Sequence, residues 1–532
     1  MAALVGGSGI FIRLGYNASS RINRGTNPPE CSREQMMDRS RSLKLFSVVV
    51  LAVLVACTTV GPDYEQPETQ MPDAWHTAAT EGLAEGDAVL QTWWRVFDDP
   101  VLDNLVLRSA DGNLGLREAL WRVEEARALR GVVAGAQKPQ VDFSGDAVRA
   151  KPSDNGAIGE LVPGSLGAAN NFSLGLGAIW EVDVFGRIRR QVEAADATAQ
   201  ASVEAYRDVL VSLYAETALA YVNVRTAQER LRIALQNVDA QEDTLQLTKD
   251  RFAAGLVSAL DVSQADSNLA NTYSLIPVIE RDLNEGMNRL AVLLGKPPGA
   301  LHHELGSDAP IPHEPAQVIM GLPTELLRQR PDVRQAERLL AAQTALIGVA
   351  TADLYPTFGL AGFLGVDAVS GSDLLSSDSV TWNIGLPIRW NIFSGGRIRS
   401  QIRVEEARTQ QLLANYEQTV LTALEESENA MVAYAKEVER RARLTQSVEA
   451  TQRSLDLVLT QYTAGLTDFQ NVLDTQRTLL LREDDLAVAE GIVIGNLVQL
   501  YRALGGGWDP DAPPEMVVSD ENEKVAMVEP AG

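Results

Sequence analysis

The sequence predicts an α+β membrane protein built as a tandem structural repeat, with four β-strands in each chain. Three observations lead to this fold class. Segment 186–295 recurs as 396–505, two very long stretches contain neither Gly nor Pro, and shorter stretches before them alternate apolar and polar residues. Repetition at a fixed offset indicates a duplicated architecture, and the two kinds of stretch indicate long helices and strands.

The duplication is visible in residues that recur at a constant offset of 210. The matching pairs include Gly186 and Gly396, Arg187 and Arg397, Tyr206 and Tyr416, Gly255 and Gly465, and Gly295 and Gly505. Upstream, RGVVAGAQKPQ from Arg130 matches IGVATADLYPT from Ile347 at an offset of 217. The first repeat is therefore expected over 96–295 and the second over 332–505, with an inter-repeat segment at 296–331.

Residues 36–56 have the features of an export signal peptide. Basic residues precede an apolar run, LFSVVVLAVLVA, that is too short to span a bilayer. The sequence LVAC, ending at Cys57, resembles a bacterial lipobox, so Cys57 is expected to carry diacylglycerol and an N-acyl chain such as palmitate, which together make a stable anchor. Residues 1–35 are expected to be a non-native extension from a misplaced start codon. An ordinary secretory signal, or a buried apolar helix with an incidental cysteine, is the alternative.

Residues 187–254 and 397–464 contain neither Gly nor Pro and are rich in strong helix formers. A helix of that length measures about 100 Å, so it needs long helical partners. Turn signals, AAGLVS and TAGLTD, follow each stretch. This pattern predicts helical hairpins over 187–294 and 397–504, with a kink or break at Pro277. Helical periodicity alone leaves an ordinary antiparallel coiled coil open.

The segments before the long helices alternate with a period of two. In FSLGLGAIWEVDV, residues 172–184, apolar residues occupy the even positions, and VTWNIGLPIRWNI, residues 380–392, repeats the pattern. Weaker partner strands are expected at about 140–150 and 356–366. Alternation over a membrane-spanning length, with aromatic residues toward the ends, is typical of a transmembrane β-barrel. A half-buried sheet in a soluble sandwich is the alternative.

Four strands cannot close a barrel, because even eight strands leave an interior that side chains fill. Lipid also forbids open sheet edges. Three chains would supply 12 strands, so a homotrimer is the smallest symmetric assembly with room for a passage. The same three chains would bring 12 helical segments beside the barrel.

Composition and motifs exclude several other functions. A net charge of −25 and a pI near 4.7 argue against nucleic acid as a partner. The motif HHELG at His302 lacks the second histidine of a zinc-protease helix, since Ser307 stands there. LLGKPPG at Leu293 lacks the glycine spacing of a phosphate loop. We therefore expect no enzyme activity, no catalytic residue, no metal site and no cofactor other than the lipid on Cys57.

Further motifs carry a family resemblance. CTTVGPDYEQP from Cys57, WWRVFDDPVLDNLV from Trp93, GLPTELLRQRPDVRQAE from Gly321 and the duplicated GRIR and AGL segments resemble the outer-membrane factor (TolC-like) family. More narrowly they resemble its NodT-type efflux lipoprotein branch, from Cys57 to about Trp508. The resemblance implies a trimeric 12-stranded outer-membrane β-barrel continued by a 12-helix periplasmic α-barrel.

The same resemblance implies the exit duct of a tripartite efflux system, of the kind that confers multidrug resistance. Such a duct passes small molecules to the exterior from an inner-membrane resistance-nodulation-division pump and a periplasmic adaptor protein. It implies a lipid-anchored location in the bacterial outer membrane, extending into the periplasm, and Thr58 after Cys57 fits outer-membrane sorting. A constitutively open porin, a type I secretion exit duct and a lipid-anchored coiled-coil spacer remain open as alternatives.

Site residues follow from the resemblance by position. The periplasmic tips that contact the adaptor are expected at Gly255, Leu256, Val257, Ser258, Gly465, Leu466 and Thr467. Asp261 and Tyr462 match partners that link adjacent hairpins in a closed periplasmic aperture, and Asp474 matches a carboxylate facing the narrowed lumen. Symmetry-related carboxylates near one axis repel one another and attract cations. For each acid, a solvated helix position is the alternative.

The family pattern is not complete at the aperture. Thr467 stands where an arginine can complete the closing network, and Asn471 where a second lumenal aspartate can stand. A latch that is weaker or differently built is therefore expected. Outside the repeats, residues 57–95 are expected to form a lipid-anchored arm and residues 506–532 an acidic, disordered tail.

Overall fold

The structure is a computed structural model that describes residues 59–69, 71–76, 83–85, 90–153, 167–320, 323–325 and 329–509. These residues belong to one compact unit that begins at Thr58. The other unit, Met1–Cys57, lies outside the described residues, and so do the predicted extension, signal peptide and lipidated cysteine. Within the described ranges, no helix combines the length and the apolar character needed to cross a membrane.

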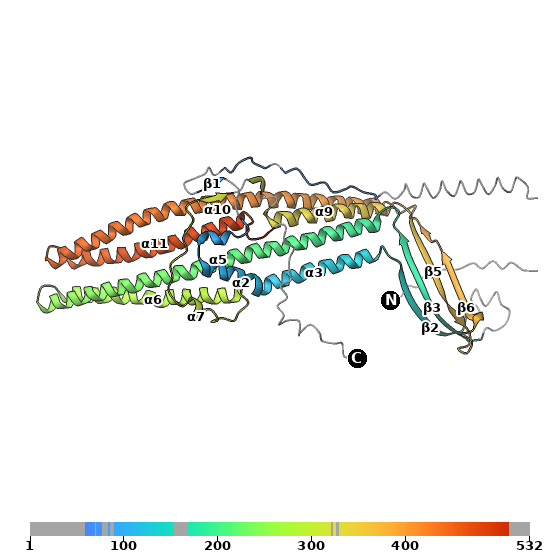
Figure 1. Cartoon of the computed structure of the whole chain (residues 1–532), viewed down its shortest axis with the longest axis horizontal. Coiled ribbons are helices and arrows are strands. Elements are labelled where there is room, and N and C mark those ends of the chain that lie inside the picture. Colours follow the sequence, from blue (N-terminus) through green and yellow to red (C-terminus); the bar gives the residue numbers. More distant parts are fainter. Residues whose placement is uncertain are drawn as a thin grey trace, which may run out of the picture. The chain divides into compact units, whose positions relative to one another are not determined.

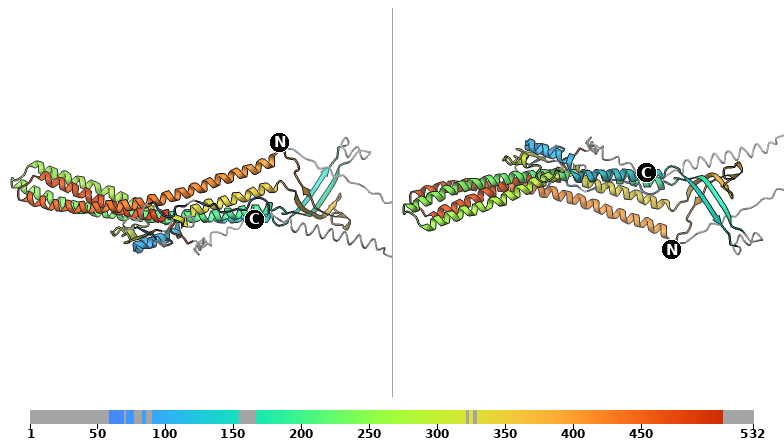
Figure 2. Two further views of the ribbon diagram at one scale, coloured as in Figure 1. Left: turned by 90° about the horizontal axis from the view of Figure 1, so that it is seen from above. Right: turned by 90° about the horizontal axis from the view of Figure 1, so that it is seen from below.

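Two helical hairpins dominate this unit (Figure 1). The first consists of α5 (Arg187–Ala253) and α6 (Ala259–Leu293), and the second of α10 (Arg397–Thr463) and α11 (Phe469–Ala503). The long helix has 67 residues and the return helix 35 in both hairpins, so the sequence duplication is also a structural one. α5 packs along both α6 and α11, which joins the hairpins side by side (Figure 2).

Shorter helices extend the two return helices, and the sequence analysis did not foresee them. α3 (Leu114–Gly135) begins where α6 ends, and the Asn113 side chain joins the two, donating to the Leu293 carbonyl at 2.9 Å and accepting from the Leu116 N–H at 2.9 Å. α9 (Pro331–Ala352) begins where α11 ends, and Arg330 donates to the Ala503 carbonyl at 2.9 Å. Each long helix thus has a composite partner of similar length, giving four helical segments per chain.

The predicted break at Pro277 does not occur, because α6 runs through it. Pro277 lies on an exposed side of the helix, where the carbonyl that loses its N–H partner can bond to water. Thr272 and Ile279, on either side, are buried. The packing of these flanking residues keeps the helix continuous through Pro277.

The sheet is antiparallel and combines strands from both repeats. Its order is β2 (Gln140–Ala150), β3 (Ala169–Val182), β5 (Thr357–Ala368) and β6 (Val380–Gly385), and the short β7 (Ile388–Arg389) also pairs with β5. The predicted continuous strand over 380–392 is therefore wrong. Pro387 has no N–H for the ladder, and its carbonyl instead accepts from the Gly359 N–H at 2.9 Å. β3 begins three residues before the predicted 172–184 strand.

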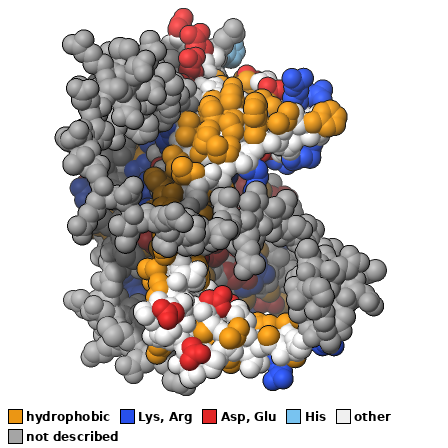
Figure 3. Space-filling model, turned by 90° about the vertical axis from the view of Figure 1, so that its right-hand side faces the viewer, with side chains coloured by type: hydrophobic (Ala, Val, Ile, Leu, Met, Phe, Trp, Pro, Cys, Tyr) orange, Lys and Arg blue, Asp and Glu red, His pale blue; other side chains and the backbone are white. Residues whose placement is uncertain are grey.

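The strand register places the alternating apolar residues of both repeats on one face. One cross-strand row consists of Phe143, Leu176, Leu364 and Trp382, and the next of Val141, Ala178, Gly362 and Ile384. These side chains are largely solvent-exposed in the single chain, for example 70% for Phe143 and 71% for Ile384. Hydrophobic side chains also gather visibly at this end of the molecule (Figure 3). The opposite face carries mainly polar and small residues.

The main core lies around the middle of the helices, where η1 (Trp93–Phe97), α2 (Pro100–Gly112) and the short α7 (His302–Leu305) pack against them. Trp93 is 1% exposed and stacks on Tyr501 with ring centroids 5.4 Å apart. Trp508 is also buried, and its indole donates to the Gln329 carbonyl at 2.9 Å. Trp93 therefore belongs to the core rather than to an arm, and the expected disordered tail cannot begin before Trp508. β1 (Leu83–Glu85) and β4 (Val318–Met320) form a separate parallel pair, and η2 (Pro323–Glu325) and η3 (Ser377–Ser379) are single turns.

Candidate functional site

The two hairpin tips have the same backbone construction. Gly255 and Gly465 adopt φ values of 73° and 74°, a left-handed conformation that glycine adopts without strain. At each tip the following leucine N–H bonds back to the last helical turn at 2.9 Å, Leu256 to the Arg251 carbonyl and Leu466 to the Gln461 carbonyl. Leu256 and Leu466 are 66% and 78% exposed. Both tips thus present an apolar side chain outward on a rigid turn.

The residues after each glycine differ between the tips. Val257 packs against the apolar cluster between the hairpins, and Ser258 begins α6 with a capping box in which Asp261 accepts from the Ser258 N–H at 3.0 Å. In the second tip, the Thr467 hydroxyl accepts from the Asn471 side-chain amide at 2.8 Å. The predicted tip residues therefore lie together at one end of the hairpins, and Asp261 already has a structural role within its own chain.

The predicted aperture residues do not contact one another within one chain. The Tyr462 side chain is buried against Phe469, with ring centroids 5.3 Å apart, and its hydroxyl has no hydrogen-bond partner among the described residues. Asp474 is exposed and accepts from Gln470 at 2.8 Å. The link that the resemblance implies between Asp261 and Tyr462 is thus not made inside a protomer.

Arg251 makes the contact between the two tips, and the sequence analysis missed it. Its Nη1 donates to the Thr463 carbonyl at 2.9 Å, and its guanidinium lies 4.7 Å from the centre of the Tyr462 ring. Thr463 is the last residue of α10, where free carbonyls and the helix dipole favour a positive charge. The only signal in the sequence is that the duplicate position carries Gln461, so the cation is present in one repeat alone.

A second set of polar contacts joins the hairpins farther from the tips. Arg230 of α5 and Asp484 of α11 form an ion pair with Nε–Oδ1 2.7 Å apart. Arg477 donates to Asn268 at 2.8 Å, and Gln476 donates to Thr244 at 2.8 Å. These bonds fix the register between the two hairpins along their length.

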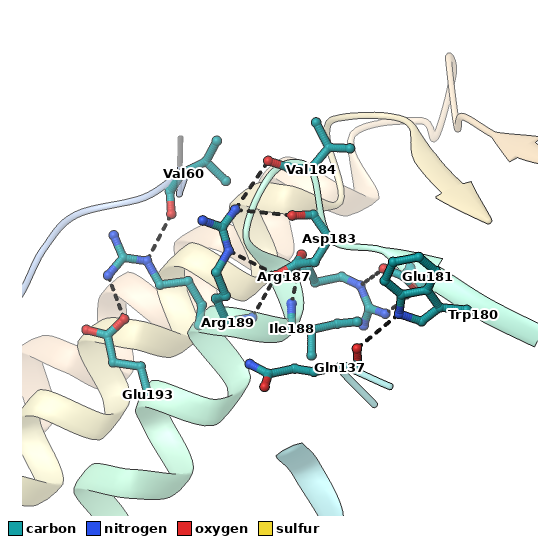
Figure 4. A network of polar contacts seen from close by, with 11 residues as sticks. Val60, Gln137, Trp180, Glu181, Asp183, Val184, Arg187, Ile188, Arg189 and Glu193 are labelled. Carbon is teal, nitrogen blue, oxygen red and sulfur yellow. Dashed lines mark hydrogen bonds and ion pairs between the residues drawn. The ribbon is translucent and has the colours of Figure 1, made fainter. Parts of the chain in front are cut away.

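Several ion pairs and hydrogen bonds join the sheet to the helices in the first repeat (Figure 4). Arg187 and Glu181 form a salt bridge at 2.6 Å, and Asp183 accepts from the backbone N–H groups of Ile188 and Arg189 at 3.1 and 2.9 Å. Asp183 therefore caps the start of α5 with a negative charge. Trp180 of β3 donates to the Gln137 carbonyl at 3.0 Å, which ties the strand to the end of α3.

Arg190 connects this junction to the chain that precedes the first repeat. Its side chain is 3% exposed, and it pairs with Asp63 at 2.7 Å and with Glu193 at 2.8 Å. It also donates to the Val60 and Gly61 carbonyls. The second repeat lacks this construction, since Asn391, Phe393 and Ser400 stand where Glu181, Asp183 and Arg190 stand in the first.

Comparisons with known proteins agree on one kind of relative. A family model described as outer membrane efflux protein matches residues 106–296 and 322–506. Nodulation protein T of Rhizobium leguminosarum bv. viciae is 30% identical over 90% of this chain and 96% of its own length. The probable outer membrane lipoprotein SilC of Salmonella typhimurium is 29% identical over 88% and 99%. The solved structure of the outer-membrane channel OprN is 41% identical, with a TM-score of 0.79, and covers 85% of this chain and all of the other.

Proposed function

Because this chain belongs to the outer membrane efflux protein family, we propose that three copies of it form the exit duct of a tripartite efflux system. The predicted resemblance to the TolC-like family is thereby confirmed. The duct passes small molecules from an inner-membrane resistance-nodulation-division pump and a periplasmic adaptor across the outer membrane. Its 12 strands form the membrane barrel and its 12 helical segments the periplasmic α-barrel.

The observation that carries this function is the sheet. Among the described strands of one chain, β2 and β6 each leave one edge unpaired. The apolar face carries large side chains that are at least half exposed, such as Phe143, Leu176 and Trp382. Neither feature is stable in water or in lipid until the edges pair with those of other copies and the apolar face meets acyl chains. A soluble sandwich or a coiled-coil spacer would require neither.

The long helices support a duct rather than an open porin. A porin consists of barrel strands alone, whereas α5 and α10 each extend 67 residues away from the sheet and end in matched exposed tips. A helix of that length spans about 100 Å, which suits a passage that must reach across the periplasm. We assign the adaptor contact to the tips around Leu256 and Leu466.

Two finer assignments complete the proposal. Cys57 carries the lipid anchor, supported by the signal sequence before it, and the relative SilC is itself named a lipoprotein. Asp261, Tyr462 and Asp474 belong to the closed aperture. Asp261 and Asp474 reach the surface of the single chain and contact neighbouring copies, whereas Tyr462 is buried beneath Arg251 and supports the tip from within. The duct performs no catalysis, and the described residues contain no grouping of His, Cys, Asp and Glu suited to a metal ion.

Single-channel conductance in planar bilayers tests the proposal. The wild type is expected to conduct weakly and the Asp261→Ala/Asp474→Ala variant strongly. Asp266→Ala is the matched control, because Asp266 is an exposed acid of α6 near the same tip. A large, steady wild-type current that the double variant does not change would indicate an open pore. A verified trimer without any current would indicate a structural spacer.

A further inference from the structure

Phe363 departs from the pattern of the sheet face that lines the barrel interior. The register places Phe363 opposite Gly177 on β3 and Asn383 on β6, away from the apolar rows. Its neighbours on this face are polar or small: Asp142, Ser144, Asp146, Ser173, Gly175, Gly365, Asp367, Thr381 and Asn383. In a closed barrel the apolar face meets lipid, so this polar face meets the passage. A half-buried aromatic ring therefore stands in a polar lumen.

The outer atoms of the Phe363 ring lie next to two glycines from different repeats. Gly175 and Gly365 are paired across β3 and β5. A Cβ at Gly175 would lie 2.3 Å from Phe363 Cζ and 2.6 Å from Cε2, and a Cβ at Gly365 would lie 2.8 Å from Cζ. Any larger residue at Gly175 would push the ring off the wall. The two glycines thus leave the space that the half-buried ring occupies on this face of the sheet.

The aromatic ring is specific to one repeat. At the upstream offset of 217, the position that matches Phe363 in the first repeat is Asp146, which lies on the same face. Ile179, also on this face and 68% exposed, is the diagonal neighbour of Phe363 across β3 and β5. Phe363, Ile179 and Val148 are the larger apolar side chains on an interior wall whose other described groups are mostly hydrophilic or small.

We propose that Phe363 is the interior contact for apolar and aromatic groups of exported solutes, so that the duct serves organic molecules with such groups rather than bare metal ions. The proposal rests on the proposed function, since it needs the polar face to line a passage. An aromatic face attracts other rings and organic cations. With one copy per chain, the trimer offers three such faces at one level of the barrel, among carboxylates that favour cations.

Current block by two matched cations tests the proposal in planar bilayers. Benzyltrimethylammonium and tetramethylammonium carry the same charge and differ by one aromatic ring. Added on the barrel side, benzyltrimethylammonium should block the wild type, and Phe363→Ala should raise its half-blocking concentration about threefold to tenfold. Block by tetramethylammonium, which has no ring to pack on Phe363, should weaken by a smaller factor. Equal benzyltrimethylammonium block in the wild type and Phe363→Ala would overturn the proposal.

A pair of glycine variants tests the position of the ring. Gly175→Ala places a methyl group against the ring, whereas Gly177→Ala, on the same strand and face, meets no atom within 4 Å. Gly175→Ala should move the ring into the passage and lower the potassium conductance, and Gly177→Ala should leave it unchanged. Identical conductance in the two variants, with trimers of normal stability, would contradict the geometry.

A binding measurement separates this inference from the proposed function. Saturation-transfer NMR on the purified trimer reports contact with benzyltrimethylammonium whether or not the protein conducts. A trimer that conducts but shows no Phe363-dependent binding would refute the Phe363 assignment alone. A trimer that binds the probe through Phe363 but never conducts would leave the assignment standing and refute the duct.

Discussion

The Arg251 guanidinium donates to the carbonyl of Thr463 at 2.9 Å, and so joins the last turn of α5 to the last residue of α10. It also covers the ring of Tyr462, the residue that the family resemblance places at the aperture. This contact holds the two tips of one protomer together. An opening that separates the tips must break it.

We predict that Arg251→Met favours the open duct. The substitution removes one hydrogen bond and one cation–π contact, together about 1 to 2 kcal/mol, which corresponds to roughly a fivefold to thirtyfold shift of the opening equilibrium. Single-channel open probability measures it. Lys249→Met is the control, because Lys249 is an exposed cation on the same turn. Equal open probabilities in the two variants would show that the contact of Arg251 with Thr463 and Tyr462 does not hold the duct closed.

Asp261 has two possible effects, and a second variant separates them. Asp261→Ala removes half of the capping box and should cost α6 about 1 kcal/mol. Ser258→Ala removes the other half of the same box but keeps the carboxylate. If the aperture assignment is right, Asp261→Ala raises conductance much more than Ser258→Ala does. Hydrogen exchange in the first turn of α6 should increase in both.

Arg190→Met is expected to destabilise the junction strongly. Arg190 is almost fully buried and donates to two carboxylates and two carbonyls. Because the carboxylates of Asp63 and Glu193 are exposed and can be solvated after the substitution, the loss should cost about 1 to 3 kcal/mol. Arg399→Met, in the corresponding turn of α10, should change stability by less than about 0.5 kcal/mol, because Arg399 is exposed. Thermal unfolding of the purified trimer compares the two, and similar losses would show that the junction is not held by Arg190.

Glu490 of α11 should make the packing around the middle of the helices more stable in mild acid. It borders a cavity of about 190 Å³ together with Glu229, Glu314 and Arg441. Burial, and then the charge of Glu229, raises the pKa of Glu490 above its usual value. Stability from its protonation is therefore full below the unfolded pKa and is lost as pH rises through the folded pKa.

The thermal midpoint measured from pH 4.5 to 7 should show this dependence, and Glu490→Gln should reduce it. Glu314 does not offset the effect of Glu490 on stability in that pH range. Burial is the largest single influence on Glu314 and raises its pKa, but the hydrogen bonds from Arg441 and from its own backbone, together with the charges of Arg441 and His313, outweigh burial, so the net shift is downward. Its stabilising contribution is therefore lost only at lower pH. A midpoint that responds to pH equally in both proteins would assign the effect to another group.

The sequence predicted what depends on local chemistry. Gly255 and Gly465 predict the left-handed turns, and alternating apolar and polar residues predict the strands. Both features are determined by residues that are close together in the sequence. Pro277 and Pro387 show the limit of such reasoning. Pro387 interrupts an edge strand, where its missing N–H matters, whereas Pro277 is overridden by the packing of α6.

Long-range contacts account for most of what the sequence analysis missed. Trp508 follows three glycines in an acidic tail, and only the Gln329 carbonyl and the cation of Arg207, 4.4 Å from its ring centre, show that it belongs to the core. In the sequence, Arg251 likewise resembles any other helical arginine, and only the structure shows that it contacts Thr463. The role of Phe363 depends on a glycine 188 positions earlier in the chain, at Gly175.

The unequal junctions of the two repeats have a mechanical consequence for the assembled ring. α5 starts from a fixed point, because Asp183 caps it, Arg187 is tied to β3 and Arg190 is tied to the preceding segment. α10 starts after Phe393 and Gly396 with no side-chain cap. A ring of three chains therefore alternates α5, whose start is held by several side-chain contacts, with α10, whose start is held by fewer. Tilting α10 at its start would break fewer side-chain contacts than tilting α5, so widening of the far end costs least through α10.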